Sequence, residues 1–96
     1  MRMGLVRGRH KLPVETYVFD AIDDPTDLDK LWDIAEGALK GYKCIDLYVT
    51  GLTVATVTVI NVCFELGILL HLFHFNPETG EYFQQYTPHR SDVNLF

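Results

Sequence analysis

The sequence predicts a small α/β domain with a three-layer, Rossmann-like fold. Its expected order is βαβαββ, with a mostly parallel sheet and one antiparallel edge strand. Strand-like and helix-like segments alternate from residue 14 to residue 75, as in parallel sheets with crossover helices. The run Ile68–Phe75 is almost wholly apolar, which suits a strand covered on both faces. The turn Asn76–Gly80 then leads into a returning strand, Glu81–Tyr86.

All 96 residues are expected to form a single domain, with a basic arm at 1–13 and a C-terminal tail at 87–96. The apolar content of 48% is ordinary for a globular chain. Neither a membrane span nor a secretory signal is recognisable in the sequence. Cys44 and Cys63 lie in apolar surroundings and are expected to be reduced, with a disulfide as the alternative. These features predict a cytoplasmic protein.

The first strand is expected at Val14–Asp20, which is rich in β-branched and aromatic residues. The helix that follows ends at Gly41. Its start is open between two caps: Asp24 followed by Pro25, or Thr26 with an acid three positions later. One apolar stripe at helical spacing predicts the face that packs on the sheet: Leu28, Leu31, Trp32, Ala35, Ala38 and Leu39.

The second strand is expected at Cys44–Val49, and the segment Thr53–Leu66 after it is ambiguous. Its many β-branched residues suit a strand, and the preceding turn suits a hairpin. Fourteen residues are nevertheless long for a strand and ordinary for a helix. The segment also ends in Glu-Leu-Gly, which is typical of a helix C-terminus. We therefore expect a helix with Thr53 as its N-cap.

The charge is negative and unevenly distributed. A net charge of −5 argues against binding to duplex nucleic acid, which needs a basic surface. Residues 1–14 carry four basic side chains and no acidic one, whereas residues 15–36 carry eight acidic side chains and a single lysine. The acidic segment is either a solvated helix face or a docking face for a basic partner, the arm included.

Three groups of polar side chains are expected beyond the carboxyl ends of the strands, where open parallel sheets bind ligands. Asp20, Asp23 and Asp24 form either a divalent metal site or a helix cap with its loop. His74, near the end of the third strand, and Asn76, just after it, form the second group, in which His74 is either structural or the best acid/base candidate.

The turn Thr50-Gly51-Leu52-Thr53 is the third group at this edge. At the start of a helix, backbone N–H groups and threonine hydroxyls can hold an anion or a phosphate. The same residues also suffice as a turn and a cap without a ligand. We predict that Thr50, Gly51, Leu52 and Thr53 bind a ligand together with Asn76.

Other candidate chemistry is sparse. His71 and His74 point in opposite directions on a strand, so His71 is expected to be a satisfied core residue. The sequence contains no HExxH, CxxC, GxSxG or phosphate-loop spacing, and it predicts no cofactor. Whether the protein is an enzyme stays open.

The stretch Leu47–Thr53, with Glu65–Gly67 and Asn76–Tyr82, resembles the distal half of CRISPR-associated Rossmann-fold (CARF) domains and the small ring nucleases related to them. In that family an apolar strand leads into a Thr-Gly-Gly-Thr-Lys-like turn, followed by a helix, a Leu-Gly stop and another apolar strand. The stretch from Leu47 to Tyr82 that carries these residues covers about a third of the chain. The chain departs from the family at Leu52, where the second glycine stands, and at Val54, where the lysine stands.

The resemblance implies a homodimer that binds a cyclic oligoadenylate across its two-fold axis. Thr50, Gly51 and Thr53 would line the pocket. Metal-independent cleavage would use the ribose 2′-hydroxyl, with His74 as the acid/base group.

Three functions are therefore considered. The first is a small nucleotide- or anion-binding homodimer. The second is a non-catalytic interaction module whose acidic helix face docks on a basic partner. The third is a metal-dependent hydrolase that uses the three aspartates.

Overall fold

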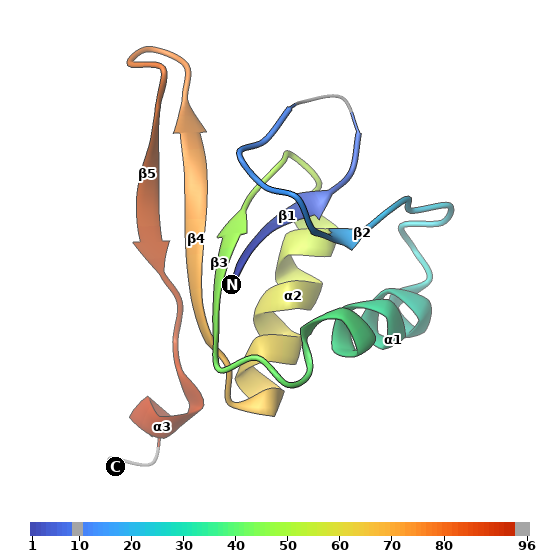
Figure 1. Ribbon diagram of the computed structural model, residues 1–96. Coiled ribbons are helices and arrows are strands. Elements are labelled where there is room, and N and C mark those ends of the chain that lie inside the picture. The colour runs from blue at the N-terminus through green and yellow to red at the C-terminus, as the bar shows by residue number, and fades with distance from the viewer. Residues whose placement is uncertain (9–10, 94–96) are drawn as a thin grey trace.

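The computed structural model describes residues 1–8 and 11–93, and it shows an α/β fold built on one five-stranded sheet (Figure 1). The strand order is β2-β1-β3-β4-β5. The elements are β1 (Arg2–Val6), β2 (Tyr17–Phe19), α1 (Leu28–Leu39), β3 (Cys44–Tyr48), α2 (Thr53–Leu66), β4 (Leu69–Asn76), β5 (Glu81–Tyr86) and the short α3 (Arg90–Val93).

The pairing confirms the predicted class, the mostly parallel sheet and the antiparallel edge strand. β1 pairs in parallel with β2 and with β3, and β3 pairs in parallel with β4. β5 runs antiparallel to β4 and ends the sheet order. Gly80, with φ of 73°, closes the turn between them, as predicted for a position that needs a positive φ.

The N-terminal segment differs from the expected arm. Residues 2–6 form β1, which lies inside the sheet between β2 and β3. Met3 and Leu5 of this strand are fully buried, which anchors the segment in the core. The strand expected at Val14–Asp20 is shorter and covers only Tyr17–Phe19.

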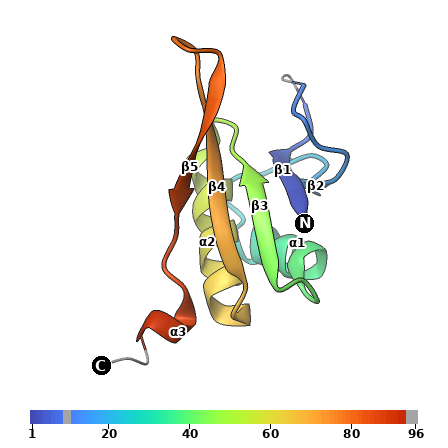
Figure 2. The same cartoon turned by 60° about the vertical axis from the view of Figure 1, so that its left-hand side comes forward.

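Helices α1 and α2 lie on the same face of the sheet and contact each other (Figure 2). The crossover through α1 leads from β2 past β1 to β3, and the crossover through α2 continues in the same direction to β4. Right-handed crossovers that run in one direction place their helices on one face. The described part of the chain therefore has two layers of regular structure, where the sequence favoured three.

One hydrophobic core fills the space between the sheet and the helices. Residues at alternate positions of β3 and β4 point into it, because side chains of a strand alternate between the two faces. Its largest fully buried side chains are Phe19, Met3, Leu5, Leu39, Ile45, Leu47, Leu70, Val59, Val62 and Cys63. The opposite face of β3 and β4 carries the half-buried side chains of the same strands, Asp46 and His71 among them.

Helix α1 begins later than either predicted cap. Asp27 is the N-cap, and its carboxylate accepts a hydrogen bond of 3.1 Å from the backbone N–H of Lys30. Asp24 instead accepts bonds from the hydroxyl and the backbone N–H of Thr26, at 2.6 and 2.9 Å. Asp24 and Thr26 thus build the turn before the helix rather than capping it. The predicted stripe is confirmed in part, with Leu31, Ala35 and Leu39 buried and Leu28 exposed.

Helix α2 confirms the helical interpretation of Thr53–Leu66. Two of its threonines satisfy their hydroxyls within the helix: those of Thr56 and Thr58 donate to carbonyls four residues earlier. Gly67, with φ of 70°, ends the helix in the left-handed conformation. Among the described residues, we find no helix with the length and apolar character needed to cross a membrane.

The segment after β5 docks on the domain through polar contacts. The Thr87 hydroxyl donates to the Leu70 carbonyl at 2.8 Å, and the Arg90 guanidinium donates to the Glu65 carbonyl at 2.8 Å. The apolar end that was expected to dock, Leu95-Phe96, lies outside the described residues.

Candidate functional site

Two pockets open at the carboxyl ends of the parallel strands, and both are lined by Thr50 and Gly51. The first, of about 470 Å³, also includes Lys11, His74 and Tyr82. The second has a volume of about 530 Å³. Its wall is completed by the end of β1 and the residues after it (Val6, Arg7 and Gly8), by Ile22 from the loop before α1 and by Leu52 at the start of α2. The turn predicted as a ligand site therefore separates two hollows at the edge where open α/β sheets bind ligands.

The first pocket exists because neighbouring strands end at different heights. β3 ends at Tyr48 and the chain then turns towards α2, whereas β4 continues to Asn76 (Figure 1). The end of β4 and the part of β5 paired with it consequently lie beside the turn, beyond the end of β3. Phe75 and Tyr82, which are paired across β4 and β5, reach this pocket together.

Leu52, rather than the predicted Thr53, is the N-cap of α2, and Thr53 is the first helical residue. Leucine has no side-chain acceptor, and no side-chain bond caps this helix start. The N–H groups of the first turn of α2 are therefore left for water or a ligand. The positive end of the helix dipole adds to the attraction for an anion at this position.

Basic side chains from the N-terminal segment stand beside these pockets. Arg7 lines the second pocket, pairs with Asp20 through Nε and Oδ1 at 3.0 Å, and lies over the Tyr17 ring with 4.7 Å between Cζ and the ring centre. Lys11 lines the first pocket. Both residues belong to the segment 1–13, which the sequence predicted as a basic arm. His10 and Arg9 of that segment lie outside the described residues.

His74 and Asn76 do not share one role. His74 lines the first pocket, its Nε2 lies 2.9 Å from Oε1 of Gln85, and its ring stacks on Phe83. Asn76 accepts a hydrogen bond from the backbone N–H of Glu78 and so shapes the hairpin turn, and it is absent from the lining of both pockets. His74, the candidate acid/base group, thus lies beside the first pocket, whereas Asn76, which was predicted to bind the ligand, lies in the hairpin turn.

The three candidate metal-binding aspartates are each engaged separately. Asp20 pairs with Arg7, and Asp23 lies 4.0 Å from the ammonium group of Lys30. The hydrogen bonds from Thr26 hold the pKa of Asp24 below its ordinary value. All three side chains are exposed, and the structure does not gather them into a cluster with metal-binding geometry within the described residues.

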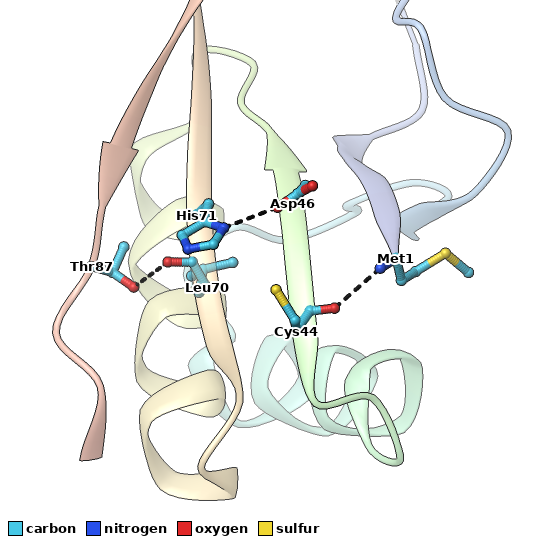
Figure 3. A network of polar contacts seen from close by, with 6 residues as sticks. All are labelled: Met1, Cys44, Asp46, Leu70, His71 and Thr87. Atoms are coloured by element: carbon cyan, nitrogen blue, oxygen red, sulfur yellow. Dashed lines mark hydrogen bonds and ion pairs between the residues drawn. The ribbon is translucent and has the colours of Figure 1, made fainter. Parts of the chain in front are cut away.

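A different cluster with metal-ligand chemistry lies on the open face of the sheet. Cys44, Asp46 and His71 present one ligand atom each, all within 4.8 Å of one another. Nδ1 of His71 lies 3.1 Å from Oδ1 of Asp46 (Figure 3). Sequence reasoning missed this cluster because the strand register, which pairs Asp46 with His71, creates it. The only local signal was the i, i+2 spacing of Cys44 and Asp46 on one strand face.

Comparison of the chain with protein-family models, with curated proteins and with solved structures finds no match. The resemblance to CARF domains therefore stays a prediction drawn from residues 47–53, 65–67 and 76–82.

Proposed function

We propose that the protein binds a small phosphate-bearing ligand, specifically a nucleotide, at the turn Thr50–Thr53. The observation that supports this proposal most is that Thr50 and Gly51 line both pockets at the uncapped start of α2. A phosphate at this position would receive backbone N–H donors and the helix dipole.

Charge and shape support the choice of ligand. Lys11 lines the first pocket and Arg7 the second, so both pockets contain a positive charge although the chain has a net charge of −5. Phe75 and Tyr82 offer aromatic surface in the first pocket, on which a nucleobase can stack. The first pocket is in the usual size range of small-molecule sites.

In its narrower form, the proposal is that the ligand is a cyclic oligoadenylate. This form is based on the residues that resemble CARF domains. Leu52 and Val54 stand where the family has a glycine and a lysine. The contacts to phosphate would therefore have to come from Arg7 and Lys11. In this form the protein is a homodimer. Cleavage would use the ribose 2′-hydroxyl as nucleophile, with His74 as the proton-transfer group.

Titration calorimetry with inorganic phosphate, AMP and cyclic oligoadenylates tests the proposal. Gly51 offers a sharp variant: a Cβ there would meet no atom within 4 Å, and its φ is not in the left-handed region. Gly51→Ala should therefore keep the fold, yet its methyl group would hinder a ligand that approaches the backbone. We expect at least one nucleotide to bind and Gly51→Ala to weaken it about tenfold or more.

Gly37→Ala is the matched control, because a Cβ at this glycine of α1 also meets no atom within 4 Å. It should bind like the wild type. The proposal fails if no nucleotide produces heat, or if Gly51→Ala and wild type bind equally. If inorganic phosphate binds as tightly as the nucleotides, the nucleoside makes no contribution and the ligand is an inorganic anion.

The second candidate function is docking of a basic partner on α1. The acidic side chains of this helix are exposed, and its face also presents Leu28 and Ile34 to solvent. Charge reversal at Asp29 and Asp33 tests it, with loss of salt-sensitive partner binding as the expected result. Partner binding that is indifferent to both changes would exclude this face.

A further inference from the structure

We propose that Cys44, Asp46 and His71 bind a divalent transition-metal ion of the zinc type on the open face of the sheet. This site is separate from the pockets at Thr50, because Cys44 begins β3 and the turn follows the end of that strand. The inference is therefore independent of the proposed nucleotide function.

The backbone brings the three ligands together. Cys44 and Asp46 are two residues apart on β3, so their side chains leave the same face. His71 is the register partner of Asp46 on β4, and its side chain shares that face. Figure 3 shows the His71 ring directed at the Asp46 carboxylate, with the Cys44 sulfur beside them. Two adjacent strands of the central sheet are a rigid platform for such a site.

The present distances are close to those of a bound ion. The three ligand atoms lie within 4.8 Å of one another, and the His71–Asp46 pair is already at 3.1 Å. In a tetrahedral zinc site, bonds of about 2.0 to 2.3 Å separate the ligand atoms by roughly 3.3 to 3.8 Å. Small side-chain rotations, chiefly at Cys44, bridge the difference without moving the strands.

The donor set selects the class of metal. A thiolate and an imidazole favour zinc and similar borderline-soft ions over magnesium or calcium, which prefer oxygen ligands. Three protein ligands leave one position of a tetrahedron open, as in catalytic zinc sites. The Asp46 side chain is 40% exposed and that of His71 18%, so water can reach the open position.

The surroundings support the ligands. The Tyr86 ring meets the His71 ring edge to face at 5.1 Å between centres, which limits rotation of the imidazole. The backbone of β3 is held by Met1, whose nitrogen donates to the Cys44 carbonyl at 3.2 Å and whose carbonyl accepts from the Asp46 N–H at 2.8 Å. Cys63, the other cysteine, is buried in the core and cannot compete for the ion.

The plain alternative is that Asp46 and His71 form a structural pair beside an unrelated thiol. Cobalt(II) titration of the reduced protein separates the two readings, because cobalt bound to a thiolate shows a charge-transfer band in the near ultraviolet, and tetrahedral cobalt shows intense visible bands. A structural pair gives neither. We expect both sets of bands to saturate at one cobalt per chain and to disappear when zinc is added.

Variants assign the bands to residues. Cys44→Ser should abolish the charge-transfer band, and His71→Gln and Asp46→Asn should each weaken cobalt binding about tenfold or more. Cys63→Ala should keep the full spectrum, and so should Gly51→Ala, which alters only the turn at the pockets. Absence of the bands in the wild type overturns the proposal without need of any variant. Retention of the charge-transfer band in Cys44→Ser, or its loss in Cys63→Ala, also overturns it.

Discussion

The Tyr17 ring occupies the space that a side chain at Gly4 would need. A Cβ at position 4 would lie 2.5 Å from Cε1 of Tyr17 and 3.0 Å from Cδ1 of Leu12. Gly4 is also the register partner of both Tyr17 and Tyr48, so it sits where β1 is enclosed by β2 and β3. A glycine here lets an aromatic ring pack directly against β1.

Gly4→Ala should therefore lower the free energy of unfolding by about 1 to 3 kcal/mol, the usual cost of adding a methyl group to a packed site. Urea denaturation followed by circular dichroism measures the change. Gly37→Ala is the control, because that glycine lies within α1 with open space around it and should gain up to about 1 kcal/mol. Equal stability of Gly4→Ala and wild type would contradict the packing described.

The sequence was sufficient to predict α2 and the β4–β5 hairpin, because local signals agree there. Length and the glycine at position 67 favoured a helix over the strand propensity of its threonines and valines, and Gly80 marked the turn. β1 was missed, since Arg2–Val6 is short and contains a glycine, and only pairing with strands distant in sequence makes it central. Turns can be recognised from their local sequence, whereas the position of an interior strand depends on the strands that pair with it.

The same distinction applies to the sites. The turn at Thr50 and Gly51 lies at the predicted edge because helix starts and strand ends carry local signals. The cluster at Cys44, Asp46 and His71 depends on register between β3 and β4, and a shift of one residue would send His71 to the other face. No local pattern contains that information.

The cap of α1 gives a second test of stability. Asp27 holds the first turn through Lys30, although the sequence pointed to Asp24 or Thr26. Asp27→Ala should lower the free energy of unfolding by about 0.5 to 2 kcal/mol. Asp29→Ala is the control, because this exposed acid of the first turn adds only its charge to the helix dipole. If the two variants lose the same stability in urea, the cap is not at Asp27.

The two cysteines should differ in reactivity. Both are free, Cys44 is half-buried and Cys63 is 1% exposed. A thiol reagent at neutral pH should modify Cys44 in the folded protein and Cys63 only after denaturation. The Cys44→Ser variant should show no fast reaction, and zinc should protect Cys44 in the wild type if it binds there. Fast reaction of both thiols in the native protein would contradict the burial of Cys63.

Cys63 should also make stability depend on alkaline pH. Burial raises its pKa from 9.0 to about 12, so the folded protein keeps a proton that the unfolded chain releases. Stability from this group is present below pH 9 and is lost as the pH rises from about 9 towards 12. Cys63→Ala should fall less steeply than wild type in urea denaturation across that range. Parallel curves for the two proteins would show that the buried thiol makes no contribution.

The β5 edge of the sheet is where we expect a second copy of the chain to bind. β5 ends the strand order, and Phe83 and Tyr86 on it are 54% and 74% exposed. An unpaired edge with exposed aromatic side chains favours pairing with a second copy. We expect a dimer in sedimentation velocity, and Phe83→Lys should weaken it about tenfold or more, because a charge on an edge strand opposes pairing. Ile34→Lys, on the exposed side of α1, is the control and should stay dimeric. A monomeric wild type at all concentrations, or an unchanged dimer in Phe83→Lys, would place any assembly away from β5.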